Sequence, residues 1–410
     1  MRSHWSAVFL TLAAAACSNE PLPSAPGTLA QSAANTGPRY DVVTLSSLGG
    51  SASRGMAIND DGVVAGWSLQ ADGTRHAVLW SGQTIIPLGS LGGPNTTVPW
   101  PGLNDRGMVV GIGQTGAPDT LAEAWSCEDG GFIPVTSPRQ VCRGFFWFQG
   151  VMQPMPTLGG THSFATSVNN RGQVVGWAEM AQHDPTCTAA LGTGPQQLGF
   201  LAVLWEPLRG RLRRLRPFPG HSATAATAIN ERGQVVGISG DCDQAVGRFS
   251  ARKAALWQGD RLIEIPNLGG TSWHTPMDIN AKGDVTGFSN PPLPGDVNGD
   301  FLGHAFYWRY GADRAVDLGT LPGDALSEGF GINALGQVVG VSFGGTSGSR
   351  AFIYENGVMT NLNDLVDVAP NVLQSAQHIN DAGQITGRMR DAATGKVLAF
   401  IATPRREDRR

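Results

Sequence analysis

One short segment occurs seven times along the chain, and it constrains the fold more than any other feature of the sequence. Its clearest copy spans residues 228–237 and reads AINERGQVVG. In every copy an aliphatic residue precedes an asparagine, and glycines follow three and seven places after that asparagine. The repeated asparagines are Asn59, Asn104, Asn169, Asn230, Asn280, Asn333 and Asn380. Seven copies at fixed offsets indicate one structural unit that is used seven times.

This segment predicts a tight β-hairpin. Asn-x-x-Gly fits a type I turn whose glycine adopts the left-handed conformation and forms a bulge. Asparagine opens such turns because its side chain bonds to the backbone two residues further on. The apolar, β-branched residues on both sides are typical of strands. We interpret the asparagine as structural, since seven copies cannot all form one active site.

The spacing of the copies predicts a β-propeller. Successive asparagines are 45, 65, 61, 50, 53 and 47 residues apart, which is the period of propeller blades. Each repeat contains two further strand patterns, one that usually ends in tryptophan or tyrosine and one short apolar strand that is often followed by Leu-Gly-Gly. No segment has helical periodicity of useful length. We therefore predict an all-β fold over residues 40–403, a seven-bladed β-propeller with four antiparallel strands per blade.

The lengths of the connections predict where one blade ends and the next begins. The Asn-x-x-Gly turn and the two-residue joins after the tryptophan strand are tight, so they form hairpins within one sheet. With blade boundaries in the Leu-Gly-Gly loops, the seventh repeat lacks one strand. We expect the strand at 41–45 to pair with the strand at 397–402 and close the ring. Long loops at 113–142, 178–200 and 288–303 then share one face, where binding residues usually lie.

The beginning of the chain predicts export. Residues 1–17 contain a short apolar run that ends in small residues and Cys17, which resembles a bacterial lipoprotein cleavage box with Ala14 in place of the usual leucine. An ordinary secretory signal is the alternative. Residues 18–39 are rich in Ser, Pro, Ala and Gly and predict a flexible tether, and 404–410 form a charged tail. We expect a protein of the cell envelope whose membrane contact is a lipid anchor at Cys17 in the outer membrane, or otherwise a secreted one.

Several blocks of the chain resemble the HAF-repeat family of extracellular repeat proteins. His304-Ala305-Phe306 spells that name, and Ile-Asn-x-x-Gly-x-Val-Val-Gly and Asp317-Leu318-Gly319-Thr320-Leu321 are similar to its other blocks. The resemblance covers nearly the whole mature chain. It implies an exported β-propeller, and it implies no activity, because the family has no catalytic motif to carry across.

Charge gives little reason to expect nucleic acid as a partner. The net charge is −4 and the pI is near 6.1. The segment 209–216 is locally basic, and its alternation predicts the solvated face of an outer strand, with a polyanion such as lipopolysaccharide as the alternative ligand. We expect the protein to be a monomer.

Four cysteines follow Cys17, and an even count in an exported protein favours disulfides. We expect Cys127 to pair with Cys142 within one loop, and Cys187 to pair with Cys242 between loops of neighbouring blades. Metal binding and free thiols are the alternatives, although no Cys-x-x-Cys spacing supports a metal site.

Three histidines form the candidate ligand-binding site. His162, His221 and His274 fall in the loops that enter blades three, four and five, and Trp273 precedes the last of them. Neighbouring imidazoles could bind a metal or an anionic ligand. The alternative is that they are ordinary polar residues on solvated loops.

A second candidate is a calcium loop, and calcium is the one cofactor that the sequence raises. Asp296, Asn298 and Asp300 supply oxygen ligands at alternate places. Phe301 and Tyr307 stand where a full calcium loop needs glycine and glutamate, so a simple Asp/Asn turn is the alternative.

These features favour a binding module for a protein or glycan partner, which is bound through the long-loop face. No nucleophile elbow, phosphate loop or His-Glu-x-x-His element is present. The alternative is an exported hydrolase or lyase that uses the three histidines with Asp241 and Asp243 on the same face. A purely structural repeat protein of the envelope is a third hypothesis.

Overall fold

The structure is a computed structural model that describes residues 39–123, 127, 132–134, 136–187, 196–243 and 248–405. The described residues belong to one compact unit, Pro38–Arg410. The predicted export signal with Cys17, nearly all of the tether and the end of the charged tail lie outside the described residues. No helix in the described part of the chain has the length and hydropathy to span a bilayer.

The described residues form 28 strands and three short 3₁₀ helices, with no α-helix among them, so the predicted all-β class is confirmed. Five sheets contain four antiparallel strands each. They are β6 (Thr96–Thr97), β7 (Val109–Pro118), β8 (Gln140–Phe148), β9 (Val151–Pro154); β10 (Gly159–Val168), β11 (Val174–His183), β12 (Leu198–Glu206), β13 (Arg211–Arg214); β14 (Ala223–Ile229), β15 (Val235–Gly240), β16 (Lys253–Gln258), β17 (Arg261–Ile265); β18 (Thr275–Ile279), β19 (Val285–Ser289), β20 (His304–Trp308), β21 (Val316–Gly319); and β22 (Leu326–Ile332), β23 (Val338–Phe343), β24 (Arg350–Glu355), β25 (Val358–Asn361). The 3₁₀ helices are η1 (Pro207–Arg209), η2 (Asp296–Asn298) and η3 (Leu362–Leu365).

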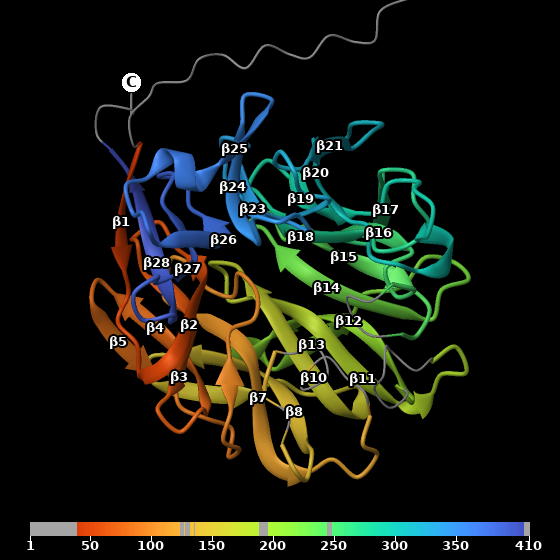
Figure 1. The fold of residues 1–410 in the computed structure, drawn as a ribbon. Coiled ribbons are helices and arrows are strands. Elements are labelled where there is room, and N and C mark those ends of the chain that lie inside the picture. Colours follow the sequence, from red (N-terminus) through yellow and green to blue (C-terminus); the bar gives the residue numbers. More distant parts are fainter. Residues whose placement is uncertain are drawn as a thin grey trace, which may run out of the picture. The chain divides into compact units, whose positions relative to one another are not determined.

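The sixth sheet joins the two ends of the described chain. It contains β1 (Tyr40–Thr44), β2 (Gly49–Ile58), β3 (Val64–Gln70), β4 (Arg75–Ser81), β5 (Thr84–Pro87), β26 (Val372–Ile379), β27 (Ile385–Arg390) and β28 (Val397–Pro404). As the sequence predicts, β1 pairs antiparallel with β28, with Val42 opposite Ala402. β28 also meets β2 through one parallel bridge, Ala52–Val397. Figure 1 shows β1 in red beside β28 in blue.

Each repeat turn has the predicted geometry. The amide of the first glycine donates to the carbonyl of the repeat asparagine, as in Gly233 N to Asn230 O at 3.0 Å. All seven of these glycines have positive φ, namely Gly62, Gly107, Gly172, Gly233, Gly283, Gly336 and Gly383. Any other residue would be strained there. The Oδ1 atom of each asparagine accepts a backbone N–H four residues on, and in five copies also the N–H two residues on.

Glycine is required at the second position of the repeat for a different reason, which the sequence did not reveal. A register shift in the inner strand brings a carbonyl oxygen against this position, as between Ala226 and Ala228 in β14. A Cβ on Gly237 would lie 2.1 Å from Ala225 O. The same clash with the equivalent carbonyl, at 1.9–2.1 Å, occurs at Gly66, Gly176, Gly287, Gly340 and Gly387. At Gly111 a Cβ would lie 2.2 Å from Thr97 O, a carbonyl two residues earlier in its repeat. Glycine is therefore required by the bulge in the neighbouring strand.

Apolar side chains pack between successive sheets. One cluster joins Val236 and Leu256 of one sheet to Ile279, Phe306 and Trp308 of the next. Buried tryptophans also fix loops, because indole N–H groups donate to loop carbonyls. Trp80 donates to Ser46 O, Trp257 to Arg216 O and Trp308 to Ala312 O, each at 2.8 Å.

The second repeat departs from the others at its inner strand. β6 contains only Thr96 and Thr97. Pro99 and Pro101 follow, and proline lacks the N–H that a central strand donates to its neighbour. Pairing resumes only as an isolated bridge between Leu103 and Val109.

Candidate functional site

The seven repeat asparagines form a ring of hydrogen bonds. Each side-chain Nδ2 donates to the backbone carbonyl of the asparagine in the next repeat, and Asn380 donates back to Asn59. The seven bonds are Asn59–Asn104 at 3.2 Å, Asn104–Asn169 at 2.8 Å, Asn169–Asn230 at 3.2 Å, Asn230–Asn280 at 3.0 Å, Asn280–Asn333 at 3.0 Å, Asn333–Asn380 at 3.2 Å and Asn380–Asn59 at 2.9 Å. We call these seven residues the asparagine ring. Their Nδ2 atoms therefore link repeats, in addition to the turn that Oδ1 holds.

The asparagine ring borders a pocket of about 180 Å³. Residues that directly follow the asparagines line it, including the acids Asp60, Asp105, Glu231 and Asp381. These carboxylates accept backbone N–H groups from neighbouring repeats, such as Asp60 N to Asp105 Oδ1 at 3.1 Å and Asp381 N to Asp60 Oδ1 at 3.1 Å. Burial raises the pKa of Asp60, and the negative charges of Asp105 and Asp381 raise it further. The hydrogen bond from the Asp381 amide lowers this pKa, but it does not cancel the increase.

Two ionisable residues lie deeper in the pocket lining. His378 Nε2 is 3.7 Å from Asp278 Oδ2. The Asp278 carboxylate also accepts the N–H groups of Ile279 and Ile332 at 2.8 and 2.9 Å. Burial nevertheless raises the pKa of Asp278. The polar groups of this pocket thus hold neighbouring inner strands together.

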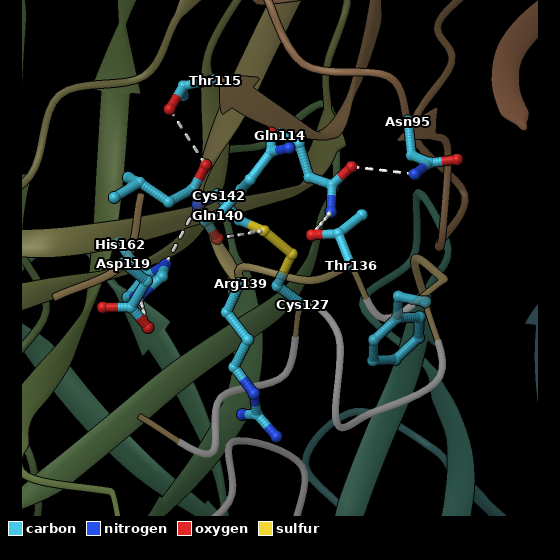
Figure 2. Close-up of a disulfide and its surroundings, with 12 residues drawn as sticks. Asn95, Gln114, Thr115, Asp119, Cys127, Thr136, Arg139, Gln140, Cys142 and His162 are labelled. Carbon is cyan, nitrogen blue, oxygen red and sulfur yellow. Dashed lines mark hydrogen bonds and ion pairs between the residues drawn. A yellow bond between two sulfur atoms is a disulfide. The ribbon is translucent and has the colours of Figure 1, made fainter. Parts of the chain in front are cut away.

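The long-loop face contains both predicted disulfides. Cys127 is bonded to Cys142, with their Cα atoms 6.2 Å apart, and Cys187 is bonded to Cys242, with their Cα atoms 4.3 Å apart. Figure 2 shows the first bond with His162 and Asp119 beside Cys142. The pairing predicted from the even cysteine count is confirmed.

His162 lies in a buried cluster with three carboxyl groups. The cluster consists of Asp119, Glu123, His162 and Glu179, and His162 is only 2% exposed. Glu123, His162 and Glu179 each place one potential ligand atom within 4.8 Å of the other two. His162 Nε2 lies 3.5 Å from Asp119 Oδ2. Sequence analysis identified the histidine but none of the three acids.

Each ring nitrogen of His162 faces a polar group. The Cys142 amide donates to Nδ1 at 3.1 Å, so Nε2 carries the ring proton and faces Asp119. Burial opposes protonation of His162, but Asp119, Glu179 and Glu123 outweigh it and raise its pKa. A second ring proton would point at the Cys142 N–H, so protonation of Nδ1 would break this hydrogen bond. A metal at Nε2 would displace the proton that faces Asp119.

The two glutamates fasten loops to the sheet. Glu179 Oε2 accepts the His162 N–H at 2.7 Å, and its Oε1 accepts the Gln196 amide at 3.2 Å. Glu123 Oε1 accepts the N–H groups of Gln197 and Leu198 at 2.9 and 2.6 Å, while its Oε2 accepts no hydrogen bond. Burial, followed by repulsion from Glu179, raises the pKa of Glu123 to about 7. This raised pKa favours a protonated Glu123 beside the Glu179 carboxyl group.

His221 and His274 have a different environment from His162. His221 Nδ1 lies 2.9 Å from Ser239 Oγ, and His274 Nδ1 lies 2.8 Å from Ser289 Oγ. The two serines occupy equivalent positions in their repeats and also accept N–H groups of the inter-blade loops. Burial lowers the pKa of His221, and it lowers that of His274 to about 4. Both side chains thus stabilise their own loops.

The other predicted ligands are also held by hydrogen bonds. Trp273 Nε1 donates to Gly299 O at 2.8 Å. Asp296 accepts the Thr271 N–H at 2.6 Å and the Asn290 amide at 2.9 Å, while Asp300 is exposed. The side chain of Asn298 lies outside the described part of the chain. Calcium binding therefore remains a prediction, with the Asp296 oxygens already occupied by N–H donors.

The charged residues named for the hydrolase hypothesis form ion pairs. Asp241 Oδ2 is 2.7 Å from Arg252, and Asp243 Oδ2 is 3.8 Å from Arg248. In the basic strand β13, Arg211, Arg213 and Arg214 are exposed, as expected for a solvated outer strand, although Arg213 and Arg214 are consecutive and do not alternate.

Three charged residues that face inward were missed by sequence analysis. Arg54, Glu328 and Arg388 are only partly exposed. Comparison between repeats could have found Arg388, because the residue eight places after the asparagine is apolar in the other six repeats: Trp67, Ile112, Trp177, Ile238, Phe288 and Val341.

No family model and no curated protein matches this chain. Several solved structures do resemble it. The β-propeller domain of the Trilobed protease from Pyrococcus furiosus is 7% identical with a TM-score of 0.44, over 85% of this chain and 93% of that one. An acylaminoacyl peptidase from Pyrococcus horikoshii is 7% identical with a TM-score of 0.47, over 84% and 50%. A Trypanosoma rangeli sialidase is 9% identical with a TM-score of 0.38, over 85% and 57%. At these identities and scores the likenesses carry no functional argument.

Proposed function

We propose that the protein is an exported, seven-bladed β-propeller that serves as a binding module at the cell envelope. Support for seven blades comes from the asparagine ring, whose hydrogen bonds run through seven repeats and return from Asn380 to Asn59. The pairing of β1 with β28 supplies the fourth strand of the last blade and supports closure by the two ends of the chain. The membership in the HAF-repeat family remains part of this proposal.

Preorganised loops support binding through the long-loop face. Two disulfides tie the loops around Cys127 and Cys187. Glu123 and Glu179 hold the same region by buried hydrogen bonds. Loops that are rigid before association lose less conformational entropy when a partner binds, which strengthens binding. This bracing of the long-loop face is the observation that carries the proposal.

The same observations favour a binding module over a hydrolase. His162 is buried in strand β10 and not in a loop as expected, and His221 and His274 are bonded to serines. Asp241 is paired with Arg252. A general acid or base has to reach the substrate. Disulfides are compatible with an exported protein. We further propose that the lipid anchor at Cys17 holds the propeller at the outer membrane, with a protein or glycan as its partner.

A crosslinking experiment on the full-length protein in intact cells tests the binding face. A photo-crosslinking residue replaces Val297, which is 79% exposed in η2 of the long loop, or Leu335, which is 73% exposed in the tight Asn333 turn. Both native side chains are apolar and exposed, so they form a matched pair. We expect adducts to protein or glycan at position 297 and not at 335. Equal adducts at both positions, adducts only at 335, or none at either would refute the proposed face.

A further inference from the structure

Arg54 and Arg388 are two like charges on strands that pack closely against each other. Arg54 lies on β2 and Arg388 on β27. Gly55 shows how closely these strands approach, because a Cβ there would lie 2.0 Å from Thr386 Oγ1. Ser375 lies beside both arginines, since its Oγ is 3.4 Å from Arg54 Nη2 and its Cα is paired with Arg388 across the sheet.

Neither guanidinium is neutralised by direct contact. Among the described residues, Arg388 makes no hydrogen bond and no ion pair, and Arg54 makes only the long bond to Ser375. The Nε atoms of both residues are buried without a hydrogen-bond acceptor. A buried guanidinium without a partner is costly, and removing the charge from such a site usually stabilises a protein.

The surrounding charges also affect the protonation of Arg54 and Glu328. Burial and then repulsion from Arg388 lower the pKa of Arg54 to about 9, while Glu328 acts in the opposite direction. Burial raises the pKa of Glu328 to about 7. A third cation, Arg75, stacks over the Trp67 ring with 4.2 Å between the guanidinium carbon and the ring centroid. Positive charge therefore exceeds negative charge in this region.

The repeats show that this charge is not required by the fold. Arg388 stands where the other six repeats have an apolar side chain. At the position of Arg54, five residues before the asparagine, the other repeats have Pro99, Phe164, Ala225, Thr275, Glu328 and Ser375. Arg54 and Arg388 are each partly exposed to water.

We propose that Arg54 and Arg388 form a binding site for the anionic group of a small ligand, a carboxylate or a phosphate. Two guanidinium groups offer several N–H donors in the planar arrangement that matches such oxygens. Ser375 Oγ supplies a further donor. This site is separate from the partner face proposed above and does not depend on it.

Thermal unfolding and calorimetric titration of the full-length protein test the site. The probes are inorganic phosphate and acetate, with chloride at the same ionic strength as the reference. We expect the Tm to rise with the concentration of at least one probe, since a ligand that binds only the folded state stabilises it. A response to phosphate alone or to acetate alone supports the site and identifies the anionic group.

Arg388→Met and Arg54→Met are the test variants. Each should lose about tenfold to hundredfold in affinity for the probe, as expected for the loss of charged hydrogen bonds. In chloride, Arg388→Met should have a higher Tm than the wild type, because it restores an apolar side chain and removes repulsion. Glu328→Gln should bind the anion more tightly. Arg390→Met, at the exposed end of β27, is the matched control and should behave as the wild type.

Two results would overturn the proposal. One is a wild-type Tm that does not respond to either probe. The other is an Arg388→Met variant that binds the probe as tightly as the wild type, or that has a lower Tm in chloride, as expected if Arg388 only stabilises the fold. Because Arg388→Met introduces a residue type suited to the core, its folding does not limit the experiment.

Discussion

Replacement of one asparagine of the ring should destabilise the whole propeller. Asn333 is 2% exposed and makes four side-chain hydrogen bonds. Its Oδ1 accepts the N–H groups of Leu335 and Gln337, both at 3.1 Å. Its Nδ2 donates to Gln337 Oε1 at 2.7 Å and to Asn380 O at 3.2 Å. Asn333→Ala removes all four bonds.

The expected decrease in the free energy of unfolding follows from these four hydrogen bonds. A neutral hydrogen bond contributes about 0.5–1.5 kcal/mol, so four of them amount to about 2–6 kcal/mol. Leu335→Ala in the same turn is the matched control, because its side chain is 73% exposed while its N–H still donates to Asn333. A surface change of this kind alters the free energy of unfolding by less than about 0.5 kcal/mol.

Equilibrium unfolding in guanidinium chloride, followed by tryptophan fluorescence with the disulfides intact, measures both variants. We expect the midpoint of Asn333→Ala to fall clearly below that of Leu335→Ala at the same slope. Equal free energies of unfolding for the two variants would refute the view that the asparagine ring stabilises the fold.

Three further outcomes are expected. Deletion of residues 40–46 should lower the Tm or cause aggregation, because the edge of β28 loses its partner; deletion of tether residues 24–30 is the control, and an unchanged Tm in the first variant would contradict closure. Cys17→Ala should abolish labelling with radioactive palmitate, and undiminished labelling would place the anchor elsewhere. The third concerns pH. Because the pKa of Glu123 is raised to about 7, the protonated pair stabilises the fold below the ordinary glutamate pKa, and this stability is lost as the pH rises through about 7. Glu123→Gln keeps an oxygen for the Gln197 and Leu198 amides, so it should gain about 1–3 kcal/mol relative to the wild type between pH 5 and pH 8. A constant difference over that range would show that the pKa of Glu123 is not raised.

The candidate site was only partly accessible to sequence reasoning. The cysteine pairs were predicted because they followed from an even count and from loop positions. The three histidines were treated as equivalent because they occur at similar places in successive loops. The structure separates them, since His162 meets Asp119 and Glu179, while His221 and His274 each meet a serine. The contact of His162 with Asp119 depends on the long insertion 113–142, which carries no repeat pattern.

The sequence by itself determined the turns, the strands and the all-β class. Asn-x-x-Gly turns and alternating apolar residues act over a few neighbouring residues, so their physical causes can be read in the chain. Only the tertiary structure decided which groups meet across repeats. It placed Asn380 against Asn59 and Arg54 against Ser375, more than 300 residues apart in sequence. It also explained the second glycine, through a carbonyl that a bulge in the adjacent strand pushes toward it. Such contacts depend on the packing of whole sheets, which no local pattern encodes.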